Sequence, residues 1–282
     1  MFVPDDLRKC VAYICFRLAD GSMRFAGSVF FAGRPIADDI PDYMFGYAIT
    51  ARHVIDGIKD KGIASVFLRV NSRAGLKWIE TDVAAWISHL DPLVDVAIYK
   101  TFLANDLDHW LWPVRGFLTS ELIRAERVGV GEEVFFTGLF SQYHGKNKNI
   151  PIVRIGNIAA MPDEPVSTRF GLMQAYLIEA RSIGGLSGSP AFINVGGGGP
   201  TRGNFVSTLA RFQLLGIVHG HFDTDELEQD LIAEDGLKRT GINTGIAVVI
   251  PADKILEAIN QFSEEEKTIA DAQREKPFPT VD

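Results

Sequence analysis

Short apolar runs, separated by glycines and polar turns, dominate the hydropathy pattern of the chain. Runs of this length that are rich in β-branched and aromatic residues favour β-strands over helices. In the first half, the predicted strands are 10–16, 25–31, 44–49, 65–70, 83–88 and 96–100. In the second half, they are 133–137, 152–158, 175–179, 191–193, 213–218 and 245–249. Two such series predict an all-β fold of two six-stranded antiparallel β-barrels.

The stretches between and after the two series have a different character. Residues 106–127 carry helical and turn-forming segments and are predicted to connect a barrel over 1–105 with a barrel over 128–250. Residues 251–275 are predicted to form a C-terminal α-helix, because Ile255, Leu256, Ile259 and Phe262 recur at helical spacing. The segment 263–275 is polar and charged, and the last stretch, 276–282, is expected to be a disordered tail.

Composition and charge exclude several classes of protein. The 282 residues carry a net charge of −8, which argues against nucleic acid as the main partner. No apolar stretch approaches the roughly 20 residues that a membrane-spanning helix needs. The start lacks a basic segment followed by an apolar one, so no signal peptide is evident. Two cysteines, Cys10 and Cys15, lie in one predicted strand on opposite faces, where they cannot bridge each other, and a cytoplasmic protein without disulfides is expected.

The segment with the most informative chemistry is 184–190, which reads Gly-Gly-Leu-Ser-Gly-Ser-Pro. It places the hydroxyl of Ser187 on a tight turn between two apolar runs. Neighbouring glycines let backbone N–H groups converge near that hydroxyl, which is an arrangement able to bind an oxyanion. Serine needs a base to become a nucleophile at neutral pH.

A matching base and acid are present in the first half of the chain. His53 stands where the apolar run 46–51 gives way to a turn or helix start, and Asp95 opens the apolar run 96–99. A carboxylate in such an apolar context needs a hydrogen-bonding partner. An imidazole N–H satisfies it and leaves the other ring nitrogen free as a base. His53, Asp95 and Ser187 are therefore the predicted catalytic residues.

Other assignments are weaker. Ser189 precedes proline and lies past the glycine turn, and Asp91 belongs to an Asp-Pro turn. The remaining histidines lack the context of His53; they are His89, His109, His144, His219 and His221. An α/β-hydrolase would need glycine at position 189 and alternating helices. A zinc site would need clustered histidine and cysteine, and their spacing along the chain does not provide it.

These segments together resemble the chymotrypsin-fold, or trypsin-like, serine peptidases. Residues 50–53 read Thr-Ala-Arg-His, 95–97 read Asp-Val-Ala and 185–190 read Gly-Leu-Ser-Gly-Ser-Pro, which resemble that family's histidine, aspartate and serine blocks in the family's order. Segments 215–220 and 243–251 resemble its cleft-lining strand and its last strand. The resemblance spans roughly residues 10–262 and is nearest to bacterial and glutamyl-endopeptidase-like members.

The resemblance implies a serine endopeptidase without a metal or organic cofactor, acting on a protein or peptide substrate. The backbone N–H groups of Gly185 and Ser187 would form the oxyanion hole. The substrate pocket would be lined by residues before the serine and by the cleft strand; these are Arg181, Ser182, Ile183, Val218, His219, Gly220 and His221. A cationic lining there would favour an acidic side chain before the scissile bond.

One departure from the family concerns activation. Many members carry an aspartate directly before the nucleophile, which pairs with a new N-terminal ammonium after cleavage, whereas this chain has Leu186. We therefore expect activity without propeptide removal. Besides a constitutively active protease, two further hypotheses remain open. One is a regulated enzyme that responds to a protein partner, and the other is a catalytically idle double barrel that serves as a binding module. The segments 196–200 and 221–241 are predicted loops, with three interpretations: they gate the cleft, bind a partner, or are plain solvated insertions.

Overall fold

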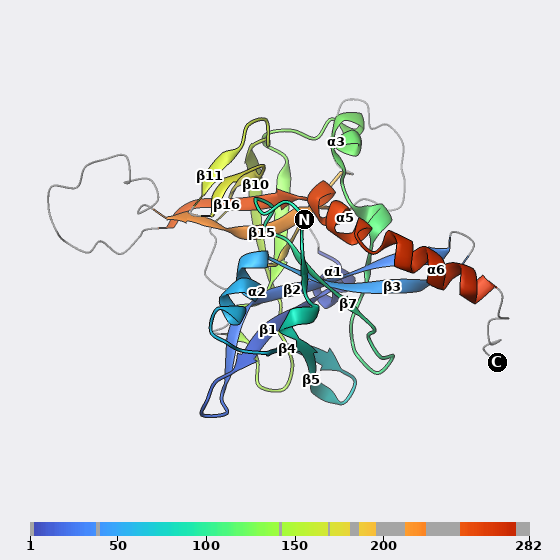
Figure 1. Cartoon of the computed structure of the whole chain (residues 1–282). Helices are drawn as coiled ribbons and strands as arrows, with labels where there is room; N and C mark the ends of the chain where they lie inside the picture. Colours follow the sequence, from blue (N-terminus) through green and yellow to red (C-terminus); the bar gives the residue numbers. More distant parts are fainter. Residues whose placement is uncertain are drawn as a thin grey trace, which may run out of the picture.

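The computed structural model describes residues 3–37, 40–140, 143–168, 170–180, 186–195, 212–223 and 243–274. Two β bodies lie one above the other, and the C-terminal helices run along their junction (Figure 1). The strand prediction is therefore confirmed in outline, and the segments that carry the candidate residues meet between the two bodies.

The first body is a sheet of eight strands in the order β5-β4-β1-β2-β3-β7-β6, with β8 paired to β2. Neighbours along this path are antiparallel, whereas β8 is parallel to β2. The strands are β1 (Val11–Arg17), β2 (Met23–Ala37), β3 (Ile40–Thr50), β4 (Ser65–Ser72), β5 (Gly75–Asp82), β6 (Ile87–Ser88), β7 (Ala97–Thr101) and β8 (Trp112–Pro113). Among the described strands, β5 and β6 end the path unpaired with each other, so a closed first barrel is not shown.

The second body is a closed barrel of six strands in the order β10-β13-β16-β15-β14-β9, as predicted for this half. Its strands are β9 (Glu133–Gly138), β10 (Ile152–Ala160), β13 (Tyr176–Glu179), β14 (Pro190–Asn194), β15 (Phe212–Asp223) and β16 (Asn243–Pro251). A small hairpin of β11 (Val166–Thr168) and β12 (Gly171–Met173) stands beside the barrel.

The predicted strand over 83–88 is wrong in most of its length. A 3₁₀ helix, η1 (Val83–Ala85), occupies its first half, and only the two residues of β6 are extended. The side chain of Asp82 accepts a hydrogen bond from the Ala84 N–H at 2.8 Å and so caps this turn. The strand that precedes it, β5, was not predicted because half of its residues are exposed and charged residues interrupt its apolar ones.

The helices are short except at the C-terminus. They are α1 (Asp5–Lys9), α2 (Arg52–Lys59), η2 (Val114–Gly116), α3 (Ser120–Glu126), α5 (Ala252–Asn260) and α6 (Ser263–Arg274). The predicted C-terminal helix is present as α5, and the following polar segment forms the regular helix α6. Glu266 attaches α6 to the first β body. It is buried, pairs with Arg34 at 3.2 Å and accepts a hydrogen bond from the Tyr47 hydroxyl. The predicted tail, 276–282, lies outside the described residues.

A common apolar core joins the two bodies. One cluster of buried side chains contains Val96 and Ile98 of the first half together with Phe135, Phe192 and Ile250 of the barrel. Burial of aromatic and branched side chains on both sides of a junction fixes the two bodies relative to each other. The segments around His53, Asp95 and Ser187 are therefore positioned by packed neighbours.

The two cysteines differ from expectation in their placement. Cys10 precedes β1 instead of lying in it, and both thiols belong to the same buried cluster, so they do not lie on opposite faces of one strand. Both are free, and burial raises the pKa of Cys15 to about 12. In the part of the chain that the structure describes, no helix combines the length and the apolar character needed to cross a membrane.

Candidate active site

His53 lies in the first turn of α2, directly after β3 ends. Ala51 is extended and precedes the helix, whose buried side chains Val54, Ile55 and Ile58 anchor it on the first sheet. Since the anchoring residues fix the face of α2 that is buried, His53 is held beside the start of β7. The side chain of His53 is 14% exposed.

Asp95 lies at the end of a turn that leads into β7. Asp91 forms this turn, because its carboxylate accepts from the Leu93 N–H at 2.9 Å and its carbonyl accepts from the Val94 N–H at 3.1 Å. The turn directs Asp95 inward, where it is 4% exposed. Its Oδ1 accepts from the backbone N–H of His53 and its Oδ2 contacts Nδ1 of the ring, both at 2.8 Å.

A second imidazole bonds to the same carboxylate. Nδ1 of His219, on β15, lies within hydrogen-bonding distance of Asp95 Oδ2, and His219 is 6% exposed. Burial by itself would raise the pKa of Asp95, but the hydrogen bonds from His219 and His53 and the charges of these rings outweigh it, and the pKa is lowered. The ionised carboxylate can only accept, so both rings carry their proton on Nδ1 when neutral.

Sequence reasoning assigned His219 to the substrate pocket through the family resemblance, and nothing in its sequence context indicated Asp95 as its partner. The two residues are 124 positions apart. The imidazole of His219 bonds to Asp95, and the backbone carbonyl of His219 is the group that faces Ser187. Because β15 supplies both groups, it links the carboxylate to the serine turn.

Ser187 stands on the turn before β14, and the turn is fixed by backbone contacts. Its carbonyl accepts from the Ser28 N–H of β2 at 2.9 Å, and the Gly188 N–H donates to the Val218 carbonyl at 2.8 Å. Gly188 has a φ of +87°, and a Cβ there would lie 2.0 Å from the Ser28 carbonyl oxygen. Glycine is therefore required at this position.

The Ser187 hydroxyl donates to the carbonyl of His219 at 2.9 Å. Among the described side chains, Ser187 and His53 are not hydrogen-bonded to each other. The structure thus brings together the His53–Asp95 pair and positions the serine turn against β15, with the hydroxyl directed at a backbone acceptor.

The neighbours of Ser187 on the turn are buried. Ser189 is 0% exposed, which makes it inaccessible to a substrate, and Leu186 is packed in the barrel core. Leu186 has no charge and no polar atom in its side chain with which to bind an ammonium group. Of the two serines on this turn, Ser187 is therefore the one with a partly exposed side chain.

An aromatic side chain from the β11–β12 hairpin covers His53. The ring of Phe170 stacks on the imidazole of His53 with 5.1 Å between centroids, and it meets His219 edge-on at 5.2 Å. Phe170 also borders a hollow of about 680 Å³ beside α2. The other residues that line this hollow are Arg52, His53, Asp56, Gly57, Asp60, Pro92, Asp95 and Met173.

The remaining predicted site residues are placed as follows. Gly185, Arg181, Ser182 and Ile183 lie outside the described residues, as do 196–200 and 224–241 of the two predicted loops. Val218 is buried and pairs with Ser189, while Gly220 and His221 lie further along β15 and are partly exposed. Other histidines have separate partners: His89 bonds to Glu257, His109 to the Leu107 carbonyl, and the His144 ring packs at a tilt against Phe25.

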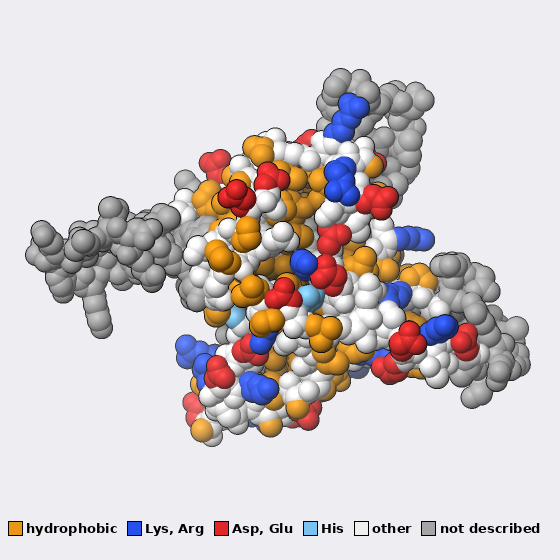
Figure 2. Space-filling model, turned by 45° about the horizontal axis from the view of Figure 1, so that its top comes forward, with side chains coloured by type: hydrophobic (Ala, Val, Ile, Leu, Met, Phe, Trp, Pro, Cys, Tyr) orange, Lys and Arg blue, Asp and Glu red, His pale blue; other side chains and the backbone are white. Residues whose placement is uncertain are grey.

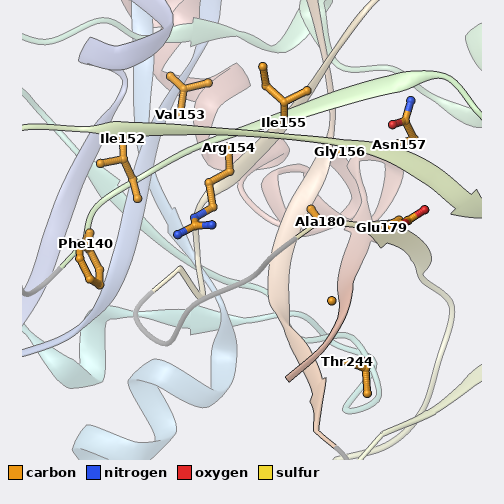
Figure 3. A pocket seen from close by; sticks show the side chains of 11 residues that line it. Phe140, Ile152, Val153, Arg154, Ile155, Gly156, Asn157, Glu179, Ala180 and Thr244 are labelled. Atoms are coloured by element: carbon orange, nitrogen blue, oxygen red, sulfur yellow. The ribbon is translucent and has the colours of Figure 1, made fainter. Parts of the chain in front are cut away.

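A second hollow, of about 930 Å³, opens between β10 and the ends of β13 and β16. Arg154 projects into it from β10 on the same side as Ile152, while Val153 and Ile155 point to the other side (Figure 3). Ala180, the last residue before the predicted pocket residue Arg181, lines this hollow. Sequence analysis did not single out Arg154, because an arginine in a half-exposed strand has no distinguishing pattern.

The outer surface carries charges of both signs. On the face in Figure 2, acidic and basic side chains of the described residues are interspersed with apolar ones, and histidine side chains reach the surface between them. Mixed charge of this kind gives no extended field of one sign on that face.

Comparison with known proteins finds similarity to solved structures. Neither models of protein families nor the sequences of curated proteins match the chain. Among solved structures, the MamO protease domain from Magnetospirillum magneticum, in its apo form, superposes with a TM-score of 0.51 at 13% identity, over 89% of this chain and 96% of that one.

The chain has the chymotrypsin fold.

Further structures with the chymotrypsin fold match at lower scores. Human heparin binding protein has a TM-score of 0.46 at 10% identity and covers 100% of this chain and 98% of its own. A glutamic acid specific serine protease that uses a histidine triad in substrate binding has a TM-score of 0.38 at 15% identity and covers 88% and 95%. At these identities the likeness concerns the fold, and the chemistry must be argued from the site.

Proposed function

We propose that the chain is a serine endopeptidase in which Ser187 is the nucleophile, His53 the general base and Asp95 the residue that orients the base. The observation that carries this proposal is the contact of His53 with the buried Asp95 beside a glycine turn that presents Ser187. Nδ1 of His53 is engaged by Asp95, so Nε2 is the nitrogen available to accept the serine proton.

The proposed reaction begins with a rotation of the Ser187 hydroxyl from the His219 carbonyl to His53. His53 removes the proton as Oγ attacks the substrate carbonyl, and Asp95 stabilises the imidazolium. The backbone N–H groups of Gly185 and Ser187 remain the predicted oxyanion donors, and one such donor is worth about 3 kcal/mol in the barrier. The leaving amine takes the proton from His53, and water then hydrolyses the acyl-enzyme with His53 again as base.

A protein or peptide is the proposed substrate class, because strand edges along a cleft can pair with an extended chain. An acidic residue before the scissile bond remains a prediction from the resemblance. Residence in the cytoplasm belongs to the same proposal, because Cys10 and Cys15 are buried and free. Regulation by a protein partner remains a hypothesis from the sequence.

The test is covalent labelling of the full chain by a fluorophosphonate probe. We expect labelling of the wild type and its loss in Ser187→Ala and in His53→Ala. Ser189→Ala is the matched control, because Ser189 is two residues away and fully buried, and it should keep the label. Circular dichroism of each variant establishes that it is folded. Labelling that survives in Ser187→Ala would contradict the assignment.

The second candidate is a catalytically idle binding module with the same fold. One observation favours it: the Ser187 hydroxyl is bonded to a backbone carbonyl and not to His53. A folded wild-type protein that takes no label over the full range of probe concentration and neutral to alkaline pH would support the binding module over the peptidase.

A further inference from the structure

Two imidazoles and a carboxylate converge at the junction of the two β bodies. His53, Asp95 and His219 each offer one ligand atom, and these atoms all lie within 4.8 Å of one another. Their positions in the chain, 53, 95 and 219, are too far apart for any spacing motif to indicate a cluster. The sequence expectation considered only the spacing of histidine and cysteine along the chain, and that spacing gives no sign of this arrangement in space.

The donor set selects a class of cation. Two imidazole nitrogens and one carboxylate oxygen suit Zn²⁺ and neighbouring transition metals, whereas Ca²⁺ and Mg²⁺ prefer all-oxygen sites. A three-residue site leaves a fourth position for water. The residues are held by their surroundings, since Asp95 Oδ1 is fixed by the His53 N–H at 2.8 Å and Oδ2 faces both rings.

Protonation allows the site to bind without an added reactant. Neutral His53 and His219 carry their protons on Nδ1, toward Asp95. Transfer of each proton from Nδ1 to Nε2 frees the Nδ1 lone pair, and no net proton is lost. The three ligand atoms then move slightly apart, so that a cation can sit among them with metal–ligand bonds of about 2.0–2.2 Å.

We propose that His53, Asp95 and His219 form a binding site for a Zn²⁺-class cation, and that occupancy switches off nucleophile activation at Ser187. Metal on Nδ1 of His53 leaves the ring proton on Nε2, which therefore cannot accept a proton from serine. The inhibitory half of this inference rests on the proposed peptidase function, and the binding half does not. Ligands from both β bodies also mean that the cation would stabilise their junction.

Binding is measured on the full chain with Co²⁺, whose visible absorption reports tetrahedral nitrogen and oxygen ligation, and by calorimetric titration with Zn²⁺. The key variant is His219→Asn, because the asparagine amide nitrogen can keep the hydrogen bond to Asp95 but is not a metal ligand. His53→Ala is the second variant. The matched control is His89→Ala, which removes another imidazole bonded to a carboxylate, that of Glu257 at 3.1 Å.

We expect one cation per chain, a higher thermal midpoint with Zn²⁺, and affinity at least tenfold lower in His219→Asn and His53→Ala but unchanged in His89→Ala. Equal affinity in wild type and His219→Asn, or the absence of Co²⁺ absorption at millimolar metal, overturns the site. Ser187→Ala keeps all three ligands but lacks the proposed nucleophile, so it should bind Co²⁺ like the wild type. Binding and labelling therefore test the two proposals separately. Co²⁺ binding by a chain that takes no fluorophosphonate label keeps the metal site and rejects the peptidase, whereas labelling without Co²⁺ binding does the reverse. Labelling that Zn²⁺ leaves unaffected at saturation overturns the switch.

Discussion

The hydroxyl of Ser187 donates its hydrogen to the backbone carbonyl of His219 at 2.9 Å. The proposed nucleophile is thus held by β15, the strand that carries His219, and the imidazole of His219 bonds to Asp95. Because the acceptor is a backbone carbonyl, a side-chain rotation suffices to release the hydroxyl toward His53. Rotation about one side-chain bond is fast compared with typical enzyme turnover, so the observed rotamer of the partly buried Ser187 is compatible with the proposed reaction.

The first prediction follows from Leu186 and concerns activation. Its buried, uncharged side chain cannot receive an N-terminal ammonium, so the untrimmed recombinant chain should take the fluorophosphonate label. Labelling rates are compared before and after limited N-terminal trimming, and we expect less than a twofold change. A chain that is labelled only after trimming would contradict this prediction. Leu186→Asp tests whether this position is apolar and buried, because a carboxylate placed there should destabilise the fold.

The second prediction concerns the pH dependence of stability. The pKa of Asp95 is lowered in the folded chain, so its ionised form stabilises the fold above the unfolded-state pKa of about 3.9. As pH falls below that value, this stabilisation is lost progressively toward the lower folded-state pKa. Asp95→Asn should therefore be less stable by about 1–3 kcal/mol at pH 7, and the difference from wild type should shrink below about pH 4.

Chemical denaturation from pH 3 to pH 7 measures this difference. Ser187→Ala is the control, because it alters the same site without removing a group that titrates in this range, and its difference from wild type should not vary with pH. A difference between Asp95→Asn and wild type that grows toward acidic pH would show that the carboxylate does not act as described.

The third prediction concerns the serine turn. Gly188→Ala forces a side chain into the left-handed region at a cost of about 1–3 kcal/mol, and its Cβ would collide with the Ser28 carbonyl. We expect a lower free energy of unfolding and loss of probe labelling, because the shift displaces Ser187. Gly129→Ala is the matched control, since no atom lies within 4 Å of its added Cβ. Wild-type labelling in a stable Gly188→Ala variant would show that the turn geometry is not needed.

The sequence predicts which segments meet at this site better than it predicts the shape of the first β body. His53, Asp95 and Ser187 occur in local patterns that depend on neighbouring residues, and the structure brings the His53–Asp95 pair into contact. His219 could not be predicted as a partner of Asp95, because strand alternation gives the face of a side chain but not its contact in another sheet. The 3₁₀ turn over Val83–Ala85 was missed because its apolar residues also fit a strand.

Arg69 is a further feature that the sequence does not predict. It is a buried cation on β4, and its guanidinium lies over the rings of Tyr13 and Phe25, which contact each other. Its guanidinium donates to the carbonyls of His144 at 2.9 Å and Gly145 at 2.6 Å. An arginine in a strand pattern ordinarily indicates an exposed position. Here the connection between β9 and β10 folds back over the first sheet and supplies acceptors that offset the cost of taking the charge out of water.

The last prediction tests this contact between the two bodies. Arg69→Met keeps much of the apolar volume but leaves the carbonyls of His144 and Gly145 without their donor, which should lower the free energy of unfolding by about 2–3 kcal/mol. Hydrogen exchange of the segment after residue 143 should increase as the connection detaches. Arg73→Met, an exposed arginine on the neighbouring turn, is the control and should change stability by less than about 0.5 kcal/mol. Equal effects of the two substitutions would mean that Arg69 does not hold the connection, whereas a selective effect assigns it that role.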